Sequence, residues 1–387
     1  MIDYLSDARA IAGDLCALRC DLHRHPELGN REYRTAERIE ACLRDLGVPA
    51  RRMLDTAVVG RLEGALPGPT VALRADMDAL PLQEATGADF ASENPGVMHA
   101  CGHDVHMAAA LGAARLLAAR RGSLPGAVVF LFQPDEEGRG GAKRMIDAGA
   151  LAGVDAVFGA HVSPDLPAGC VGVRYGKFYA ASDTFRIVVK GVSAHGAQWE
   201  KGVDALGAAA ALAGRLIDLP KALPEGERAV LSVGTFHAGS AENALADRAE
   251  LAGIIRTLGP AARAGMRRLF TEAVDAVVAD WGATAEVELR QSYPGVVNDD
   301  AMTALAERAA KRVLGDAAVR AIDAPTMTTE DFGYFLQRRP GSYYHIGAGC
   351  GLPLHNTGFL PCDDAVVTAA AVHAAVLDTF LSNQGKA

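Results

Sequence analysis

Two short segments carry side chains that can bind metal ions and move protons. The first reads MHACGHD and contains Cys101 and His103; the second reads FQPDEEG and contains Glu136 and Glu137. A thiolate and an imidazole two residues apart are good ligands for a borderline-soft divalent cation. Two adjacent carboxylates can divide two tasks, one binding metal and the other transferring protons. The two segments therefore predict one metal site with its own general base.

Both segments also have simpler explanations. Taken alone, Cys101 is more typical of a buried packing residue, and His103 or Asp104 of a residue that caps a helix. Glu136 and Glu137 could lie in a surface loop. However, the two glutamates directly follow an apolar run and precede a glycine-rich turn. At the end of a buried strand they would repel each other unless a cation neutralised one of them.

Two further histidines lie in similar surroundings. His161 follows the apolar run VFGA, and His355 lies in a glycine-rich loop within the motif LHNT. Each histidine alone is weak evidence for a metal ligand. All four motifs carry metal-binding side chains, and their convergence favours a metal site over four unrelated residues.

The first part of the chain alternates predicted strands and helices. Apolar runs at 70–74 and 127–132 lie between turn signals, as in strands that are buried on both faces. Helices are expected at 104–120 and 141–148. This alternation predicts a largely parallel sheet covered by helices, in which ligands bind beyond the carboxyl ends of the strands. Both metal-binding segments lie at such ends.

A different order begins near residue 182. The pattern predicts βαββαβ, the ferredoxin-like arrangement, with elements at 184–190, 202–216, 230–236, 248–256, 260–281 and 283–289. The chain then returns to helix and ends in an amphipathic helix at 363–381. We therefore predict an α/β protein: a mixed, largely parallel sheet with helices on both faces, interrupted by a ferredoxin-like lid and dimerisation domain. The expected domains are residues 1–181 and 293–387 (catalytic) and 182–292 (lid).

Composition limits the classes of partner. The chain has 387 residues, a net charge of -9 and 22% charged residues, so no electrostatic footprint for nucleic acid or an anionic membrane is present. No apolar stretch is expected to approach the roughly 18 residues of a membrane span, and the N-terminal residues are polar and acidic. We expect a cytoplasmic protein with a small-molecule ligand. Its seven cysteines include no CxxC pair, which argues against a disulfide framework.

The sequence strongly resembles a family of dinuclear metal-dependent amidohydrolases. This family includes bacterial aminoacylases, hippurate hydrolase, plant auxin-conjugate hydrolases and N-acetyl-diaminopimelate deacetylase, and it is related to cocatalytic zinc carboxypeptidases. The resemblance covers essentially the whole chain. It rests on the two segments above and on residues 21–28, 74–81, 159–161, 193–197, 329–332 and 354–356.

The resemblance implies a specific set of metal ligands. It implies two divalent metal ions, with Cys101 as a bridging thiolate. Zinc, manganese, cobalt and nickel all suit this mixture of thiolate, imidazole and carboxylate. The matching positions are Cys101, His103, Glu137, His161 and His355.

The resemblance also implies roles in catalysis and substrate binding. Glu136 matches the general base that takes a proton from a metal-activated water and delivers it to the leaving amine. Asp78 matches a carboxylate that orients the site. His195 matches a lid histidine that relatives present to the partner subunit's active site in a homodimer, where it would stabilise the oxyanion. Asn243 and Arg256 match positions that hold the substrate backbone or carboxylate, although a turn cap and an undetermined strand face are their simpler explanations.

The chain departs from the family pattern at several positions, among them residues 243–247, which lack the usual Val-Ile-Pro, and the two positions that follow. Trp199 lies where relatives usually have a proline soon after the lid histidine; it could line the acyl or side-chain pocket or seal the dimer interface. Asp135 replaces a common alanine before the two glutamates. If its carboxylate faces inward, it would raise the pKa of Glu136.

The leading functional hypothesis is hydrolysis of the amide bond of N-acyl-L-amino acids or related conjugates. The alternative is a dipeptidase or carboxypeptidase, or a biosynthetic deacetylase acting on a substrate such as N-acetyl-diaminopimelate. A non-catalytic binding protein on the same scaffold would have lost ligands or base, and the chain retains all of them. A redox or structural zinc protein would need more closely clustered cysteines.

Overall fold

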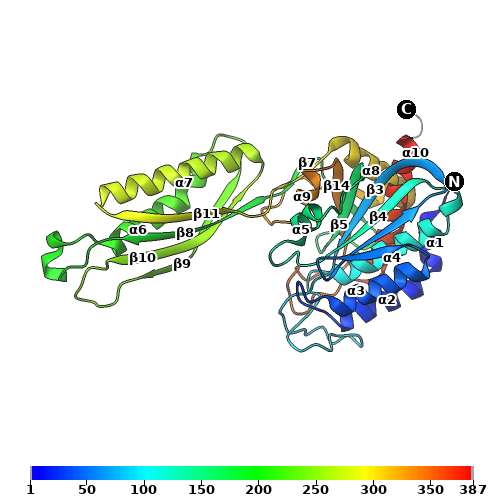
Figure 1. Ribbon diagram of the computed structural model, residues 1–387, viewed down its shortest axis with the longest axis horizontal. Helices are drawn as coiled ribbons and strands as arrows, with labels where there is room; N and C mark the ends of the chain where they lie inside the picture. The colour runs from blue at the N-terminus through cyan, green and yellow to red at the C-terminus, as the bar shows by residue number, and fades with distance from the viewer. Residues whose placement is uncertain (1, 385–387) are drawn as a thin grey trace. The chain divides into compact units, whose positions relative to one another are not determined.

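The computed structural model describes residues 2–384, which form two compact units (Figure 1). The first unit contains Met1–Gly176, Asn298–Asp323 and Asp331–Ala387, and the structure describes this unit from residue 2 to residue 384. The second contains Lys177–Val297 and Ala324–Glu330. The second unit is therefore inserted into the chain of the first.

An eight-stranded mixed sheet forms the centre of the first unit. β3 is parallel to both of its neighbours, β4 and β5, and β5 is parallel to β14. β2 runs antiparallel to β4, and β14 antiparallel to β6. This arrangement confirms the predicted mixed, largely parallel sheet. In sheet order, the strands are β1 (Ala50–Met53), β2 (Ala57–Glu63), β4 (Pro125–Gln133), β3 (Leu66–Asp76), β5 (Ala156–Ser163), β14 (Gly341–Gly347), β6 (Val171–Val173) and β13 (Val319–Ala321).

Helices cover this sheet and are labelled in Figure 1. The central strands are apolar because both of their faces are covered; every residue of β5, for example, is buried. α4 is also almost completely buried, which explains its alanine-rich sequence. The helices of this unit are α1 (Tyr4–Ala10), α2 (Ala12–Arg24), α3 (Tyr33–Asp45), α4 (His103–Ala118), α5 (Gly141–Asp147), α8 (Asp300–Leu314), α9 (Gly333–Leu336) and α10 (Asp363–Gln384).

The expectation that no apolar stretch approaches the length of a membrane span was wrong for α10. Its residues Asp363–Asn383 are long and apolar enough to span a membrane by length and composition, with a mean hydropathy of 1.6. In the structure, 89% of the most apolar 18-residue window of this segment is buried inside the protein, where α10 packs against α1, α4 and α8. The apolar run is therefore explained by burial in the core of the first unit.

The second unit has the predicted βαββαβ order. Its four-stranded sheet is antiparallel with the order β11-β8-β10-β9, and a buried apolar cluster that includes Phe185, Leu212 and Phe270 connects the sheet to its helices. The elements are β8 (Ala181–Lys190), α6 (Ala205–Asp218), β9 (Ala229–Ala238), β10 (Arg248–Thr257), α7 (Pro260–Asp280) and β11 (Thr284–Gln291). Two further strands, β7 (Gly176–Tyr179) and β12 (Val296–Asn298), pair with each other.

Candidate metal centre

The metal-binding side chains of the first unit lie where its central strands end. Cys101 precedes α4, and His103 is the first residue of that helix. Gly102 between them has φ 81°, and a Cβ atom there would lie 2.4 Å from a side-chain carbon of Val162. Only glycine fits this position, so the close approach of the Cys101 segment to β5 depends on it.

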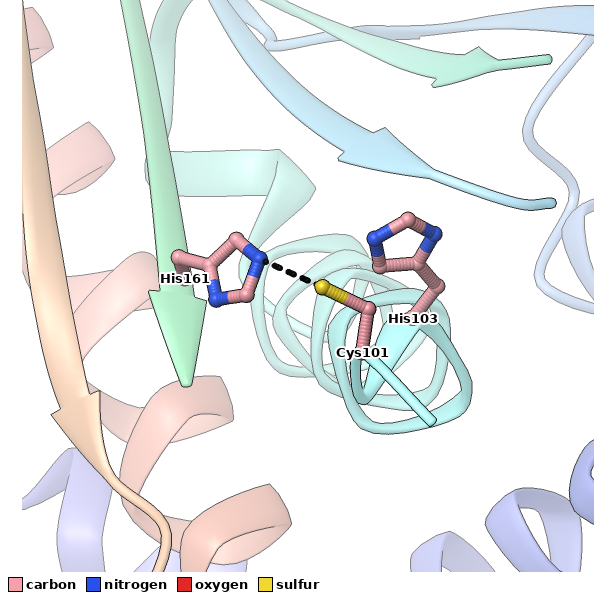
Figure 2. Close-up of side chains that lie close together, drawn as sticks. All are labelled: Cys101, His103 and His161. Carbon is pink, nitrogen blue, oxygen red and sulfur yellow. Dashed lines mark hydrogen bonds between the residues drawn. The ribbon is translucent and has the colours of Figure 1, made fainter. Parts of the chain in front are cut away.

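Cys101, His103 and His161 form a buried group of three donors (Figure 2). Their ligand atoms all lie within 4.8 Å of one another, and Cys101 Sγ is 3.3 Å from His161 Nε2. His161 comes from β5, so the group joins a strand to the start of α4. A thiol and two imidazoles at this spacing form a donor set that suits zinc and similar cations.

Glu137 and His355 extend the same cluster. Glu137, His355 and Cys101 form a second group within 4.8 Å, and His355 Nε2 lies 3.0 Å from Glu137 Oε1. The backbone N–H of His355 donates to Ala100 O at 2.9 Å, which fixes its loop beside the Cys101 segment. The structure thus brings together all five predicted ligand positions. Cys101 belongs to both groups, as a bridging ligand requires.

The imidazoles of His103 and His161 are oriented through their other ring nitrogens. His103 Nδ1 donates to the backbone O of Asp78, and His161 Nδ1 donates to Val162 O, both at 2.7 Å. This leaves Nε2 of each ring directed into the cluster. His103 Nε2 is buried and has no hydrogen-bond partner among the described residues. Because such a buried nitrogen is costly unless it is satisfied, it fits a metal ligand.

Asp78 also holds the turn that carries the two glutamates. Its Oδ1 accepts the backbone N–H of Glu136, and its Oδ2 accepts that of Glu137, each at 3.0 Å. The carboxylate is 2% exposed, so both bonds are formed away from water. One residue therefore orients His103 through its backbone and Glu136 through its side chain. His103, Glu136 and Glu137 in turn form another group of donors within 4.8 Å.

The electrostatics of the cluster favour a cation. Burial, followed by the nearby Glu137 and Glu136, raises the pKa of the Cys101 thiol well above its usual value. Burial alone would lower the pKa of His103, but Asp76 and Asp78 outweigh this and raise it to about 10. Surrounding negative charge accounts for the shift of His103 and adds to the effect of burial on Cys101. A divalent cation at this site would supply the missing positive charge and would ionise the coordinating thiol of Cys101.

Asp76 and His106 lie beside the predicted ligands, although neither was predicted as a ligand from the sequence. His106 Nδ1 donates to Asp76 Oδ1 at 2.6 Å, and both side chains form a further group with His103. Arg74 also donates to Asp76, at 2.6 Å, and holds its charge in place. Spacing could have revealed His106, because residues three apart on a helix share a face. The contact of His106 with Asp76, which lies 30 residues earlier in the chain, could be found only from the tertiary structure.

The carboxylate of Asp135 does not face Glu136, as the hypothesis of a raised Glu136 pKa requires. Its Oδ2 accepts a hydrogen bond from Asn30 Nδ2 at 2.6 Å and lies 3.4 Å from Arg144 Nη2. The carboxylate is therefore directed at an amide and a guanidinium, and its charge is compensated there. The structure does not support Asp135 as a residue that raises the pKa of Glu136.

In the second unit, His195, Asn243 and Trp199 lie in neighbouring loops. His195 Nδ1 accepts the N–H of Ala197 at 3.1 Å, so in the neutral ring Nε2 carries the proton. Gly196 N donates to Asn243 O at 2.8 Å. Trp199 follows in the short helix Gly196–Lys201 and is 68% exposed. We call this region the His195 patch.

Arg256 lies at the opposite end of β10 from the His195 patch. It pairs with Ser182 at the start of β8, and its guanidinium donates to Ser182 Oγ. Burial lowers the pKa of this guanidinium. The His195 patch lies at the other end of β10, near Arg248, because His195 pairs with Ala244. At roughly 3.3 Å per residue, about 25 to 30 Å of strand separates the patch from Arg256. The second unit therefore does not bring these predicted binding residues together.

The sequence and structure are similar to those of metal-dependent hydrolases. The pattern of "Peptidase family M20/M25/M40" matches residues 72–379. The chain is 40% identical to "N-acyl-L-amino acid amidohydrolase" of Geobacillus stearothermophilus, covering 74% of this chain and 78% of that protein. It is 36% identical to "Thermostable carboxypeptidase 1" of Saccharolobus solfataricus, covering 97% of each.

A solved structure supports the same relationship. The Bacillus subtilis YXEP protein, described as "a Dinuclear Metal Binding Peptidase from M20 Family", superposes with a TM-score of 0.87 at 34% identity. The match covers 97% of this chain and 99% of that one. The likeness therefore extends over both units.

Proposed function

This chain belongs to peptidase family M20/M25/M40, and on that basis we propose that it hydrolyses the amide bond of N-acyl-L-amino acids. One observation carries the proposal: Cys101, His103, Glu137, His161 and His355 form overlapping donor groups, with Glu136 beside them. These residues would hold divalent cations, which would polarise the amide carbonyl and lower the pKa of water. Zinc, manganese, cobalt or nickel each suits the donors.

The residues of the chain then have separate tasks. Glu136 accepts a proton from the attacking water and returns it to the leaving nitrogen. Asp78 keeps Glu136 in place by accepting its backbone N–H. Glu137 is the neighbouring metal ligand, so the two glutamates divide proton transfer and binding. In a substrate complex, Nε2–H of His195 would donate to the oxyanion.

A carboxypeptidase is the second candidate function. It is favoured by the 36% identity to a thermostable carboxypeptidase over 97% of both chains. Both activities cleave an amide next to a free carboxylate, so they share metal centre and base. They differ in the acyl side of the substrate, which is either a simple acyl group or a peptide. A deacetylase of biosynthetic intermediates would be a special case of the first activity.

A substrate panel with defined metals tests the proposal. Protein treated with a chelator is expected to lose activity to the background level, and addition of one of the four cations is expected to restore it. The restored enzyme should turn over acetyl, benzoyl and indoleacetyl amino acids faster than dipeptides, measured as kcat/KM. Faster dipeptide cleavage would support the carboxypeptidase instead. Full activity after verified metal removal would exclude both.

We also propose that the enzyme acts as a homodimer. Within the second unit, the His195 patch and Arg256 lie at opposite ends of β10, about 25 to 30 Å apart at roughly 3.3 Å per residue. A small acyl amino acid cannot reach both from one subunit. If both residues serve one substrate, one of them comes from the partner. The exposed Trp199 would then lie close to the substrate or to the subunit interface.

Complementation between inactive variants tests this arrangement. Glu136→Ala and His195→Ala subunits are each expected to be inactive as homodimers. Their heterodimer has one site with an intact Glu136 and an intact His195 from opposite subunits. Random mixing should therefore restore about one quarter of wild-type activity. If proven heterodimers remain inactive, His195 acts within its own chain or not at all.

A further inference from the structure

Three backbone N–H groups of the turn that carries the general base donate to buried carboxylates. Asp135 N donates to Glu32 Oε1, Glu136 N to Asp78 Oδ1 and Glu137 N to Asp78 Oδ2, each at 3.0 Å. The family motif accounts for Asp78. Glu32 comes from the connection between α2 and α3, and no role has been assigned to it so far.

The carboxyl group of Glu32 does not serve its own helix. Glu32 occupies the N-cap position of α3, yet its side chain makes no capping hydrogen bond. Glu27 accepts the backbone N–H groups of Arg34 and Thr35 in the first turn, at 3.2 and 2.8 Å. The carboxyl group of Glu32 can therefore accept the backbone N–H of Asp135, in the turn that carries Glu136, although Glu32 is fully buried at 0% exposure. A carboxyl buried at such cost requires a compensating interaction.

The connection that contains Glu32 is built around Asp135. Asp135 has φ 58°, a left-handed conformation that is uncommon for residues other than glycine. A Cβ atom on Gly29 would lie 2.3 Å from its Oδ1, and one on Gly138 only 2.2 Å away. Asn30 donates to the other carboxylate oxygen. The two glycines and Asn30 therefore allow the side chain of Asp135 to enter, while Glu32 binds its backbone.

We propose that Glu32 is a positioning residue for the general base, acting through the backbone of Asp135. The proposal depends on the assignment of Glu136 as that base. Asp78 holds the amides of Glu136 and Glu137, and Glu32 holds the amide that precedes them. Without the Glu32 bond, the left-handed Asp135 is free to relax, and the direction of the Glu136 side chain changes with it. A misplacement of about 1 Å can lower the rate by roughly 100-fold.

Two variants of similar size separate the hydrogen bond from packing. Glu32→Met fills the space without an acceptor, and we expect kcat to fall roughly 10- to 100-fold with KM within about twofold of wild type. Glu32→Gln keeps an acceptor oxygen and should restore kcat. Hydrogen exchange of the amides at residues 135–137 should increase in the methionine variant alone, and bound metal should stay at the wild-type amount.

Glu27→Met is the matched control. It removes a carboxylate that also accepts backbone N–H groups from the same connection, but those of α3. It should lower thermal stability and leave kcat unchanged. If both methionine variants lower kcat in proportion to lost stability, or if Glu32→Met keeps full kcat, the proposal is overturned. If Glu32→Met does not fold, Glu32→Asp shortens the side chain and should still lower kcat. Wild-type kcat in Glu136→Ala would instead show that another group is the base, and full activity after verified metal removal would overturn the proposed function.

Discussion

Replacement of Glu136 with alanine is expected to lower kcat by roughly 1,000-fold, within the range that a positioned general base contributes. The physical reason is the separation of tasks between the two glutamates. Glu137 contacts His355 at 3.0 Å and shares a donor group with Cys101, whereas Glu136 belongs to neither of the two donor groups that contain Cys101. Bound metal, measured by elemental analysis after dialysis, should therefore stay close to the wild-type amount.

Glu137→Ala is the matched control because it removes the same side chain one residue later. It should lose both activity and metal. Glu136→Gln adds a second comparison, since it preserves the size of the side chain but cannot accept the proton. Wild-type kcat in either Glu136 variant would show that another group is the base. Loss of metal in Glu136→Ala would show that Glu136 is itself a ligand.

Replacement of Cys101 with alanine is expected to have the largest effect on metal binding. Cys101 belongs to the group with His103 and His161 and to the group with Glu137 and His355, so both groups lose a donor. Metal affinity should fall by more than the roughly 10- to 100-fold that follows the loss of an outer partner of a ligand. The preference among cations should also shift away from zinc, because thiolate is the softest donor present.

Metal titration of the purified variants measures both effects. Cys170→Ala is the control, because Cys170 is also a buried free thiol of the first unit but belongs to none of the donor groups. It should bind metal like the wild type. If Cys101→Ala retains two ions per chain with unchanged affinity, the thiol does not bridge the groups, and the centre must be built from imidazoles and carboxylates alone.

Elements with clear hydrophobic periodicity could be predicted from the sequence. The central strands β3, β4 and β5 are short apolar runs, and the βαββαβ order of the second unit followed from alternating and helical patterns. The strands β1, β2 and β14 were missed. β2 pairs antiparallel with β4, and such pairing depends on neighbours that are distant in sequence. The antiparallel part of the mixed sheet therefore became visible only in the structure.

The sequence also contained an apolar segment that periodicity alone could not interpret. The window in α10 has the composition of a membrane-spanning helix, and only its burial against other helices identifies it as a core element. The same limit applies to Asp135. Its position beside Glu136 suggested an electrostatic effect on the base, but the side chain is directed at Asn30 and Arg144. Adjacency in sequence does not determine where a side chain points.

By itself, the sequence determined the chemical inventory of this protein: which donors are present, their order, and the elements that carry them. Those properties are local, since they depend on residue type and on periods of two to four residues. Only the tertiary structure decided which groups meet. Among the described residues it left His103 Nε2 without a hydrogen-bond partner, and it placed His355 against Glu137 and brought Glu32 to the amide of Asp135. These contacts join residues about 100 to 220 positions apart, and their geometry depends on how the sheet and its helices pack.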